Sequence, residues 1–135
     1  MKFNVRVLKE NDYDDILVGW WEDWKWIPPV KDFLPLNGVG GIMVEWDGTP
    51  VCAGFIYNTN SKVAWIDWIV SNNNFREKPH RKDGLNLLIQ TLTDVARKTK
   101  YKYVYAHNNN TNLINTFLAN GYLKGSKSTE LIKNL

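Results

Sequence analysis

Residues 81–98, RKDGLNLLIQTLTDVARK, decide the fold because they separate two strand-like segments. Apolar residues recur at i, i+3, i+4 and i+7 from Leu85 to Leu92, which predicts a helix with one buried face. The segments Val63–Val70 before it and Tyr101–Ala106 after it read as strands. A strand, a helix and a strand in this order form a crossover, so the two strands are expected to be parallel.

A basic turn, Arg81-Lys82-Asp83-Gly84-Leu85-Asn86, is expected to open this helix. The first N–H groups of a helix lack intrahelical partners, and the helix dipole places partial positive charge there. Gly84 has no Cβ, so its backbone can come close to a ligand. The turn therefore predicts an anion site, and the alternative is a solvated turn without a ligand.

The rest of the chain predicts one domain, residues 1–135, with an α/β mixed sheet and helices on both faces. Asp47-Gly48 predicts a tight hairpin, because these residues accept left-handed backbone conformations. Asn11 or Asp12 is expected to cap the first helix, which Pro28-Pro29 stops. The predicted order is β-α-β-β-β-α-β-α-β-β, with the remaining elements at Phe3–Val7, Gly41–Trp46, Val51–Tyr57, Asn110–Asn120, Tyr122–Gly125 and Thr129–Ile132.

Composition narrows the class of protein. The net charge of +3 is too small to make nucleic acid the main partner. The single Cys52 excludes an internal disulfide and favours a reducing, cytoplasmic setting. No apolar run approaches the ~20 residues that span a bilayer, so no membrane is expected. Two distant histidines and one cysteine show no metal-site spacing.

The closing half of the sequence resembles a known family. After the second strand of the crossover come Asn108-Asn109-Asn110, an apolar-periodic helix, and Asn120-Gly121-Tyr122. Over residues 63–125 this order resembles the GCN5-related N-acetyltransferase (GNAT) family. In that family an Arg/Gln-x-x-Gly-x-Gly/Ala turn holds the acetyl-CoA pyrophosphate, and here it reads Arg81-x-x-Gly84-x-Asn86. The resemblance implies direct transfer of an acetyl group from acetyl-CoA to a small-molecule or peptide amine, in a ternary complex.

The resemblance also implies which residues contact the cofactor. The pantetheine arm would lie between the two parallel strands, at Ile69, Val70 and Ser71, unless these are only sheet core. Phe117 stands where the family often has a general-acid Tyr, so Phe117 is expected to be core or a wall of the thiol pocket. The remaining residues expected at the cofactor are those of the turn, residues 81–86, and Asn110. The positive charges of Arg76, Lys78 and Lys82 are expected to attract its phosphates.

Asp67 is the first candidate for a general base. It is a carboxylate in an otherwise apolar strand, beside the expected thioester, so it must be paired, hydrated or raised in pKa. A solvent-facing strand position is the alternative. His107 and Glu45 are the other candidates, and each is otherwise a surface residue.

Tryptophans cluster in the first helix and the loop after it. In the family this region covers the acceptor side of the cleft, so Trp20, Trp21 and Trp24 are expected to contact the acceptor, with Glu22 attracting its positive charge. The alternative is that some of them seal the core. A second possible function is a catalytically weak or inactive GNAT-fold module that binds CoA or docks a protein through this Trp-rich surface. A homodimer is possible, but no residue specifies one.

Overall fold

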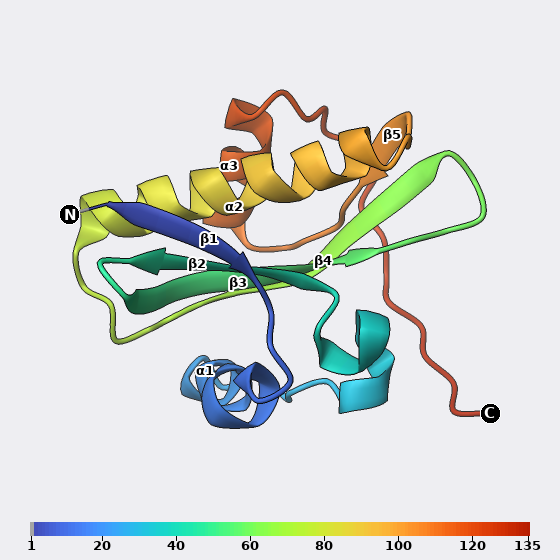
Figure 1. Cartoon of the computed structure of the whole chain (residues 1–135). Helices are drawn as coiled ribbons and strands as arrows, with labels where there is room; N and C mark the ends of the chain where they lie inside the picture. The colour runs from blue at the N-terminus through green and yellow to red at the C-terminus, as the bar shows by residue number, and fades with distance from the viewer. Residues whose placement is uncertain (1) are drawn as a thin grey trace.

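The computed structural model of the protein describes residues 2–135, apart from the side chain of Lys78. Five strands form one sheet in the order β1-β2-β3-β4-β5; the first four are antiparallel, and β5 runs parallel to β4 (Figure 1). The elements are β1 (Phe3–Val7), η1 (Tyr13–Leu17), α1 (Val18–Asp23), η2 (Lys31–Phe33), η3 (Pro35–Gly38), β2 (Gly41–Trp46), β3 (Thr49–Tyr57), β4 (Val63–Ser71), α2 (Lys78–Lys98), β5 (Tyr103–Tyr105) and α3 (Thr111–Ala119). The predicted mixed α/β fold and parallel crossover are thereby confirmed.

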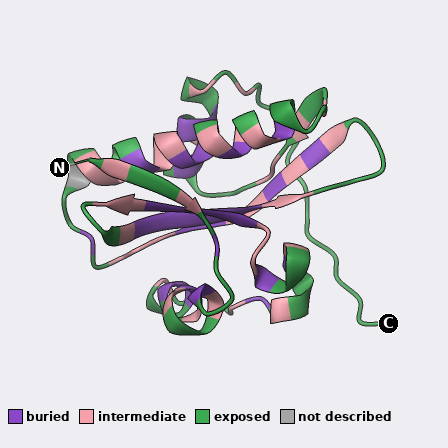
Figure 2. Cartoon of the chain, in the orientation of Figure 1, coloured by how far each residue is buried: buried purple, intermediate pink, exposed green. Residues whose placement is uncertain are grey.

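Helices cover both faces of the sheet. Figure 1 shows α2 and α3 on one face and α1 on the other. Leu88, Ile89 and Leu92 of α2 pack on the first face, while Leu17 and Trp21 pack on the second with Phe55 of β3. Figure 2 shows the buried residues concentrated in the central strands and the inward sides of the helices. Cys52 lies in this core as a free, buried thiol.

Short-range signals account for several boundaries. Asp47 and Gly48 have φ of 52° and 83° and close the β2–β3 hairpin, as predicted. The Asn110 side chain accepts a hydrogen bond from Leu113 N at 3.0 Å and caps α3, and Gly121 ends it at φ 89°. These residues act through their own backbone geometry, so their effects depend on local sequence.

The start of the crossover helix differs from the prediction. Helix α2 begins at Lys78 rather than at Arg81, because Pro79 is accommodated in the first turn, where no N–H is needed. Gly84 is therefore buried inside the helix. A Cβ at Gly84 would lie 3.1 Å from Val51 Cγ1, so the missing side chain lets α2 approach β3 closely.

Three further expectations are wrong. Residues 123–135 form neither a helix nor a strand, so the expected closing hairpin is absent. Leu131 and Ile132 of this segment are exposed and do not pack against the sheet.

The first helix begins with a π-helical turn and ends at Asp23, well before Pro28-Pro29. Lys25, which follows it, has φ 63°. Asp12 does not cap this helix with its side chain, which pairs with Arg6 instead.

Among the described residues, none of the helices combines the length and apolar character that crossing a bilayer requires. The same residues contain no group of three or more His, Cys, Asp or Glu side chains that could hold a metal ion.

Candidate active site

Strands β4 and β5 separate soon after they meet. They pair only from Val63–Tyr103 to Trp65–Tyr105, so among the described residues the backbone of β4 beyond Trp65 has no strand partner on this side. A narrow cavity of about 10 Å³ lies in the opening, with room for roughly one water molecule. Its lining comes from β4, from the chain after β5 and from α3: Ile66, Asp67, Trp68, Ile69, Ala106, His107, Asn108 and Phe117.

A bulge in β4 sets the directions of its side chains. Ala53 of β3 pairs with Val70, but Phe55 pairs with Asp67, so the single residue between them opposes two residues of β4. Trp68, one of these two, has φ 57°. Ile66 and Ile69 consequently pack in the cluster beneath α2, whereas Trp68 and Val70 pack in the cluster beneath α1. Without the bulge, strict alternation would place Trp68 on the α2 face.

Asp67 and His107 meet at the opening between the strands. Asp67 Oδ2 lies 3.5 Å from His107 Nε2, and the two side chains are 27% and 37% exposed. Asp67 Oδ1 accepts a hydrogen bond from Trp68 N at 2.8 Å. Partial burial raises the pKa of Asp67 above its usual value, the Trp68 N–H and His107 oppose this rise, and Glu130 adds to it. A carboxylate with a raised pKa is a better proton acceptor than an ordinary aspartate.

A larger, open pocket lies on the other side of Asp67. Its volume is about 350 Å³, and its lining is mainly aromatic: Phe33, Tyr57, Asn58, Thr59, Trp65, Asp67 and Trp68. Asp67 and Trp68 line both this pocket and the narrow cavity. Burial raises the pKa of Tyr57 to about 12, so its hydroxyl stays protonated and donates to Phe33 O at 2.9 Å. Asp67 is thus the titrating carboxylate between the two spaces.

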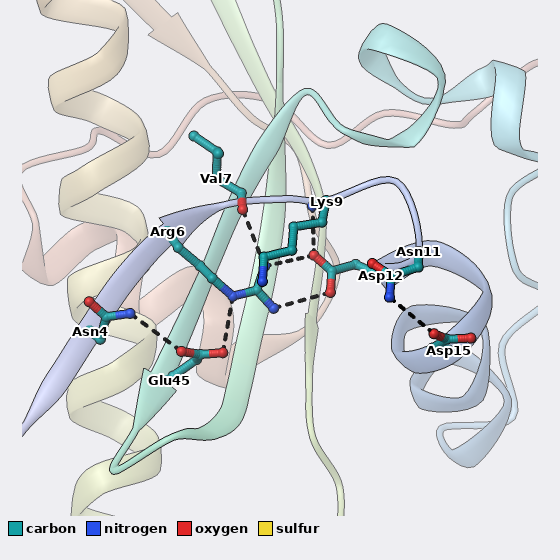
Figure 3. A network of polar contacts seen from close by, with 8 residues as sticks. All are labelled: Asn4, Arg6, Val7, Lys9, Asn11, Asp12, Asp15 and Glu45. Carbon is teal, nitrogen blue, oxygen red and sulfur yellow. Dashed lines mark hydrogen bonds and ion pairs between the residues drawn. The ribbon is translucent and has the colours of Figure 1, made fainter.

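Glu45 lies in a different part of the sheet. It accepts a hydrogen bond from Arg6 Nε at 3.0 Å, and Arg6 also makes two bonds to Asp12, at 2.8 and 3.1 Å (Figure 3). Strand β3 separates Glu45, on β2, from β4, and Glu45 lines neither pocket. The structure therefore does not bring Glu45 to Asp67 and His107; its charge is used to hold Arg6.

The tryptophans of the first helix are mostly structural. Trp20 and Trp21 are 7% and 1% exposed and pack in the core beneath α1, so burial does not favour the acceptor contact, which stays a prediction. Trp21 instead lies edge-on to Trp68, with ring centroids 6.2 Å apart, and supports it from behind. Trp24 is partly buried and donates its indole N–H to Ser71 O at 2.8 Å. Glu22 is exposed on α1 and lines neither pocket.

The residues expected at the phosphates lie in the N-terminal part of α2, apart from Arg76, which precedes the helix. The Arg81 guanidinium lies 5.3 Å from the Trp24 ring centroid, so this side chain is directed toward the end of β4. Asn86 Oδ1 accepts a hydrogen bond from Asn120 Nδ2 at 2.9 Å, which ties α2 to α3. Leu85 packs against the core, and the exposed members are Arg76, Lys82 and Asp83. The side chain of Lys78 lies outside the described part of the structure.

Of the residues expected along the pantetheine arm, Ile69 and Phe117 line the narrow cavity. Val70 is buried on the opposite face, and Ser71 offers its carbonyl to Trp24. Two nearby tyrosines carry a hydroxyl that could replace the general acid missing at Phe117. The Tyr122 hydroxyl is engaged elsewhere, because it lies 2.5 Å from Thr93 Oγ1, and burial raises the pKa of Tyr122. The other, Tyr105, stacks on Trp65.

Sequence reasoning missed the aromatic walls of the open pocket. The alternation of Trp65 and Asp67 along one strand was the available signal for part of the wall. Trp68 reaches the same face only through the bulge, and Phe33 and Tyr57 come from elements distant in sequence.

Comparisons with known proteins identify the class of fold. No protein-family model matches the sequence, and no curated protein matches it. Among solved structures, N-acetylglutamate synthase from Neisseria gonorrhoeae, complexed with coenzyme A and N-acetyl-glutamate, has a TM-score of 0.71 at 14% identity, covering 93% of this chain and 29% of that one. Glucosamine-6-phosphate N-acetyltransferase from Arabidopsis thaliana has a TM-score of 0.65 at 14% identity, covering 98% and 100%.

A GNAT family acetyltransferase from Staphylococcus aureus covers the whole of both chains, with a TM-score of 0.59 and 17% identity. At these identities the likeness is one of fold. The fold that these structures share with the chain is that of the GNAT acetyltransferases, as the order of its elements in the sequence predicts.

Proposed function

We propose that the protein is an N-acetyltransferase that moves an acetyl group from acetyl-CoA to an amine, with Asp67 as the general base. One observation carries the proposal: Asp67 lines both the opening between β4 and β5 and the open aromatic pocket, and it lies 3.5 Å from His107. A proton acceptor between two spaces is what direct transfer from one ligand to another requires.

The donor side is supported by three features of the chain. Beyond Trp65, β4 has no strand partner toward β5 among the described residues, so its backbone groups can bond an extended arm carrying amides. Arg81 N is bonded to Glu77 O, so the amide groups that precede Arg81 at the start of α2 lack intrahelical partners. Arg76, Arg81 and Lys82 add positive charge there for the phosphates of CoA. One solved structure of this fold contains coenzyme A.

The opening must widen to admit the donor. A cavity of about 10 Å³ holds no acyl thioester, so Phe117 and His107, which line it from opposite elements, have to move apart on binding. Phe117 is buried against Tyr122, with ring centroids 4.9 Å apart, so the shift involves the end of α3. We therefore expect acetyl-CoA binding to change the environment of these two aromatic rings.

The proposed reaction is a direct transfer without a covalent enzyme intermediate. Acetyl-CoA supplies a thioester, Asp67 accepts a proton from the ammonium group of the acceptor, and the freed amine nitrogen bonds to the acetyl carbon. The nitrogen becomes positively charged as this bond forms, and it loses its second proton to water. The carbon–sulfur bond breaks, and the thiolate leaves with the electron pair. Phe117 has no proton to donate, so the thiolate departs with its charge. His107, beside Asp67, holds the carboxylate in position and carries the counter-charge when it is protonated.

The test combines titration with acetyl-CoA and steady-state release of free thiol over a panel of amines. Micromolar binding with amine-dependent thiol release supports the proposal. Binding without release for any amine would make the protein a CoA-binding module, and no binding at millimolar acetyl-CoA would exclude the transferase. Docking through a Trp-rich surface has little support, because Trp20 and Trp21 are buried.

A further inference from the structure

The open pocket beside Asp67 indicates which kind of amine is accepted, and this inference rests on the function proposed above. We propose that the acceptor is a small primary amine on a flat, apolar body, such as an arylalkylamine. Its ring lies between the aromatic walls of the pocket, and its ammonium group pairs with Asp67.

The walls of the pocket are aromatic and braced from behind. Trp68 meets Phe33 edge-on with ring centroids 5.8 Å apart, and it is supported by the buried Trp21. Trp65 stacks on Tyr105 at 4.5 Å. Rings held in this way offer flat apolar surface without having to be ordered on binding. The volume of about 350 Å³ lies in the range of small-molecule sites, roughly 300–1,000 Å³.

The charge of the pocket selects a cation. Within residues 2–135 and apart from the Lys78 side chain, Asp67 is the one charged side chain that lines it, and no lysine, arginine or histidine does. Glu130, on the C-terminal segment, adds negative electrostatic potential at Asp67. An ammonium group beside Asp67 would gain from the partly buried carboxylate and from the faces of the tryptophans. A carboxylate ligand would be repelled by the same groups.

The pocket has few free hydrogen-bonding groups. The Tyr57 hydroxyl already donates to Phe33 O at 2.9 Å. Thr59 Oγ1 already contacts Ser61 Oγ at 3.0 Å and bonds to Val63 O. Asn58 remains as the neutral polar side chain at the lining. A ligand rich in hydroxyl groups would lose its hydration here without gaining partners, so an aminosugar is disfavoured against an amine with an apolar body.

The position of Asp67 orients the acceptor. Because Asp67 lines the narrow cavity as well as the pocket, an amine held by it points toward the opening between β4 and β5. The aromatic body then remains among Phe33, Trp65 and Trp68, away from the donor. This arrangement uses one carboxylate both to recognise the ammonium group and to remove its proton.

The test is calorimetric binding to the purified full chain, in the absence of acetyl-CoA, with four probes. 2-Phenylethylamine is compared with 2-phenylethanol, which lacks the charge, with 3-phenylpropionate, which reverses it, and with glucosamine, which lacks the ring. We expect 2-phenylethylamine to bind at least about tenfold tighter than each of the others, equivalent to about 1.4 kcal/mol. Asp67→Asn should remove this advantage over 2-phenylethanol, and Phe33→Ala should weaken both phenyl ligands.

Equal affinities for the four probes, or tighter binding of glucosamine, in titrations run both without and with free CoA, overturn the inference. The two proposals fail separately. Preference for 2-phenylethylamine in a protein that neither binds nor turns over acetyl-CoA leaves the pocket assignment standing and removes the transferase. Acetyl transfer to aminosugars but not to arylalkylamines leaves the transferase standing and removes the pocket assignment.

Discussion

Asp67 and His107 lie 3.5 Å apart where β4 and β5 separate, one on each side of the opening. The two residues are forty positions apart in the chain, and the parallel crossover through α2 brings them together. Asp67 also lines the aromatic pocket, so one carboxylate connects the proposed donor and acceptor sides.

Replacing Asp67 with Asn should lower amine-dependent thiol release at pH 7 by about 10²- to 10⁴-fold, the usual contribution of a general base. Affinity for acetyl-CoA should remain within about twofold, because the carboxylate does not contact the phosphates. Asp94→Asn, which removes an exposed carboxylate paired with Arg97 on α2, is the matched control and should be neutral. Wild-type turnover in Asp67→Asn would assign proton removal to another group.

The same substitution should not destabilise the fold at neutral pH. Burial raises the pKa of Asp67, so its ionisation is less favourable in the folded than in the unfolded state. Its contribution to stability is full below the usual value of 3.8 and is lost as the pH rises through the raised pKa. Urea unfolding should therefore show Asp67→Asn to be at least as stable as the wild type at pH 7, which separates lost activity from lost structure.

The pH profile of kcat/KM should shift when His107 is replaced by Gln. A positive His107 lowers the pKa of Asp67, so removing it should move the rising limb of the profile to higher pH. The limb should lie above the usual aspartate value of 3.8 in both proteins. A rising limb that does not move would show that Asp67 is not the group observed in the profile.

Arg6, Asp12 and Glu45 should contribute to stability rather than to catalysis. Asp12 is 4% exposed by its side chain and accepts from Arg6 and from Lys9 N (Figure 3). Arg6→Met leaves the Asp12 charge buried without its partner and should reduce the free energy of unfolding by about 3 kcal/mol. Lys31→Met, which removes an ion pair to the exposed Glu10, should cost under about 1 kcal/mol.

The network of Arg6, Asp12 and Glu45 also makes the stability of the fold fall at acidic pH. Burial alone would raise the pKa of Asp12, but hydrogen bonds from Arg6 and Lys9 N outweigh it and lower the pKa below 3.8. The stability from Asp12 is therefore present above 3.8 and is lost as the pH falls through the lowered pKa. Unfolding curves from pH 5 to pH 2 should show a steeper loss in the wild type than in Asp12→Asn, and parallel losses would contradict the assignment.

Gly84 should be needed for packing between α2 and β3. Alanine normally stabilises a helix by about 1 kcal/mol relative to glycine. At Gly84 the new Cβ would lie 3.1 Å from Val51 Cγ1, so the strain should outweigh this gain, and we expect a net loss of about 1 kcal/mol. Gly19→Ala, in α1 with nothing within 4 Å, should instead gain about 0.5–1 kcal/mol. Stabilisation at both positions would show that α2 shifts without cost.

Only part of the candidate site could be predicted from the sequence. Asp67 is conspicuous in the sequence because a carboxylate interrupts an apolar strand, and Phe117 falls on the core stripe of a periodic helix. The sequence does not show that Glu45 is held by Arg6, because that pairing joins β1 to β2 across 39 residues. A cluster of tryptophans in the sequence does not show whether their side chains are buried or exposed, so the burial of Trp20 and Trp21 could not be predicted.

Local patterns in the sequence determined the class of fold, the β2–β3 turn, the cap of α3 and the parallel crossover, because each depends on residues close together in the chain. The tertiary structure alone decided that α2 starts at Lys78, that residues 123–135 add no strand, and that Trp68 shares a face with Asp67. These features depend on how β3 pairs with β4 and on which apolar residues pack against the rest of the protein. Such pairings join distant residues, so their free energy is set by packing in three dimensions rather than by local preference.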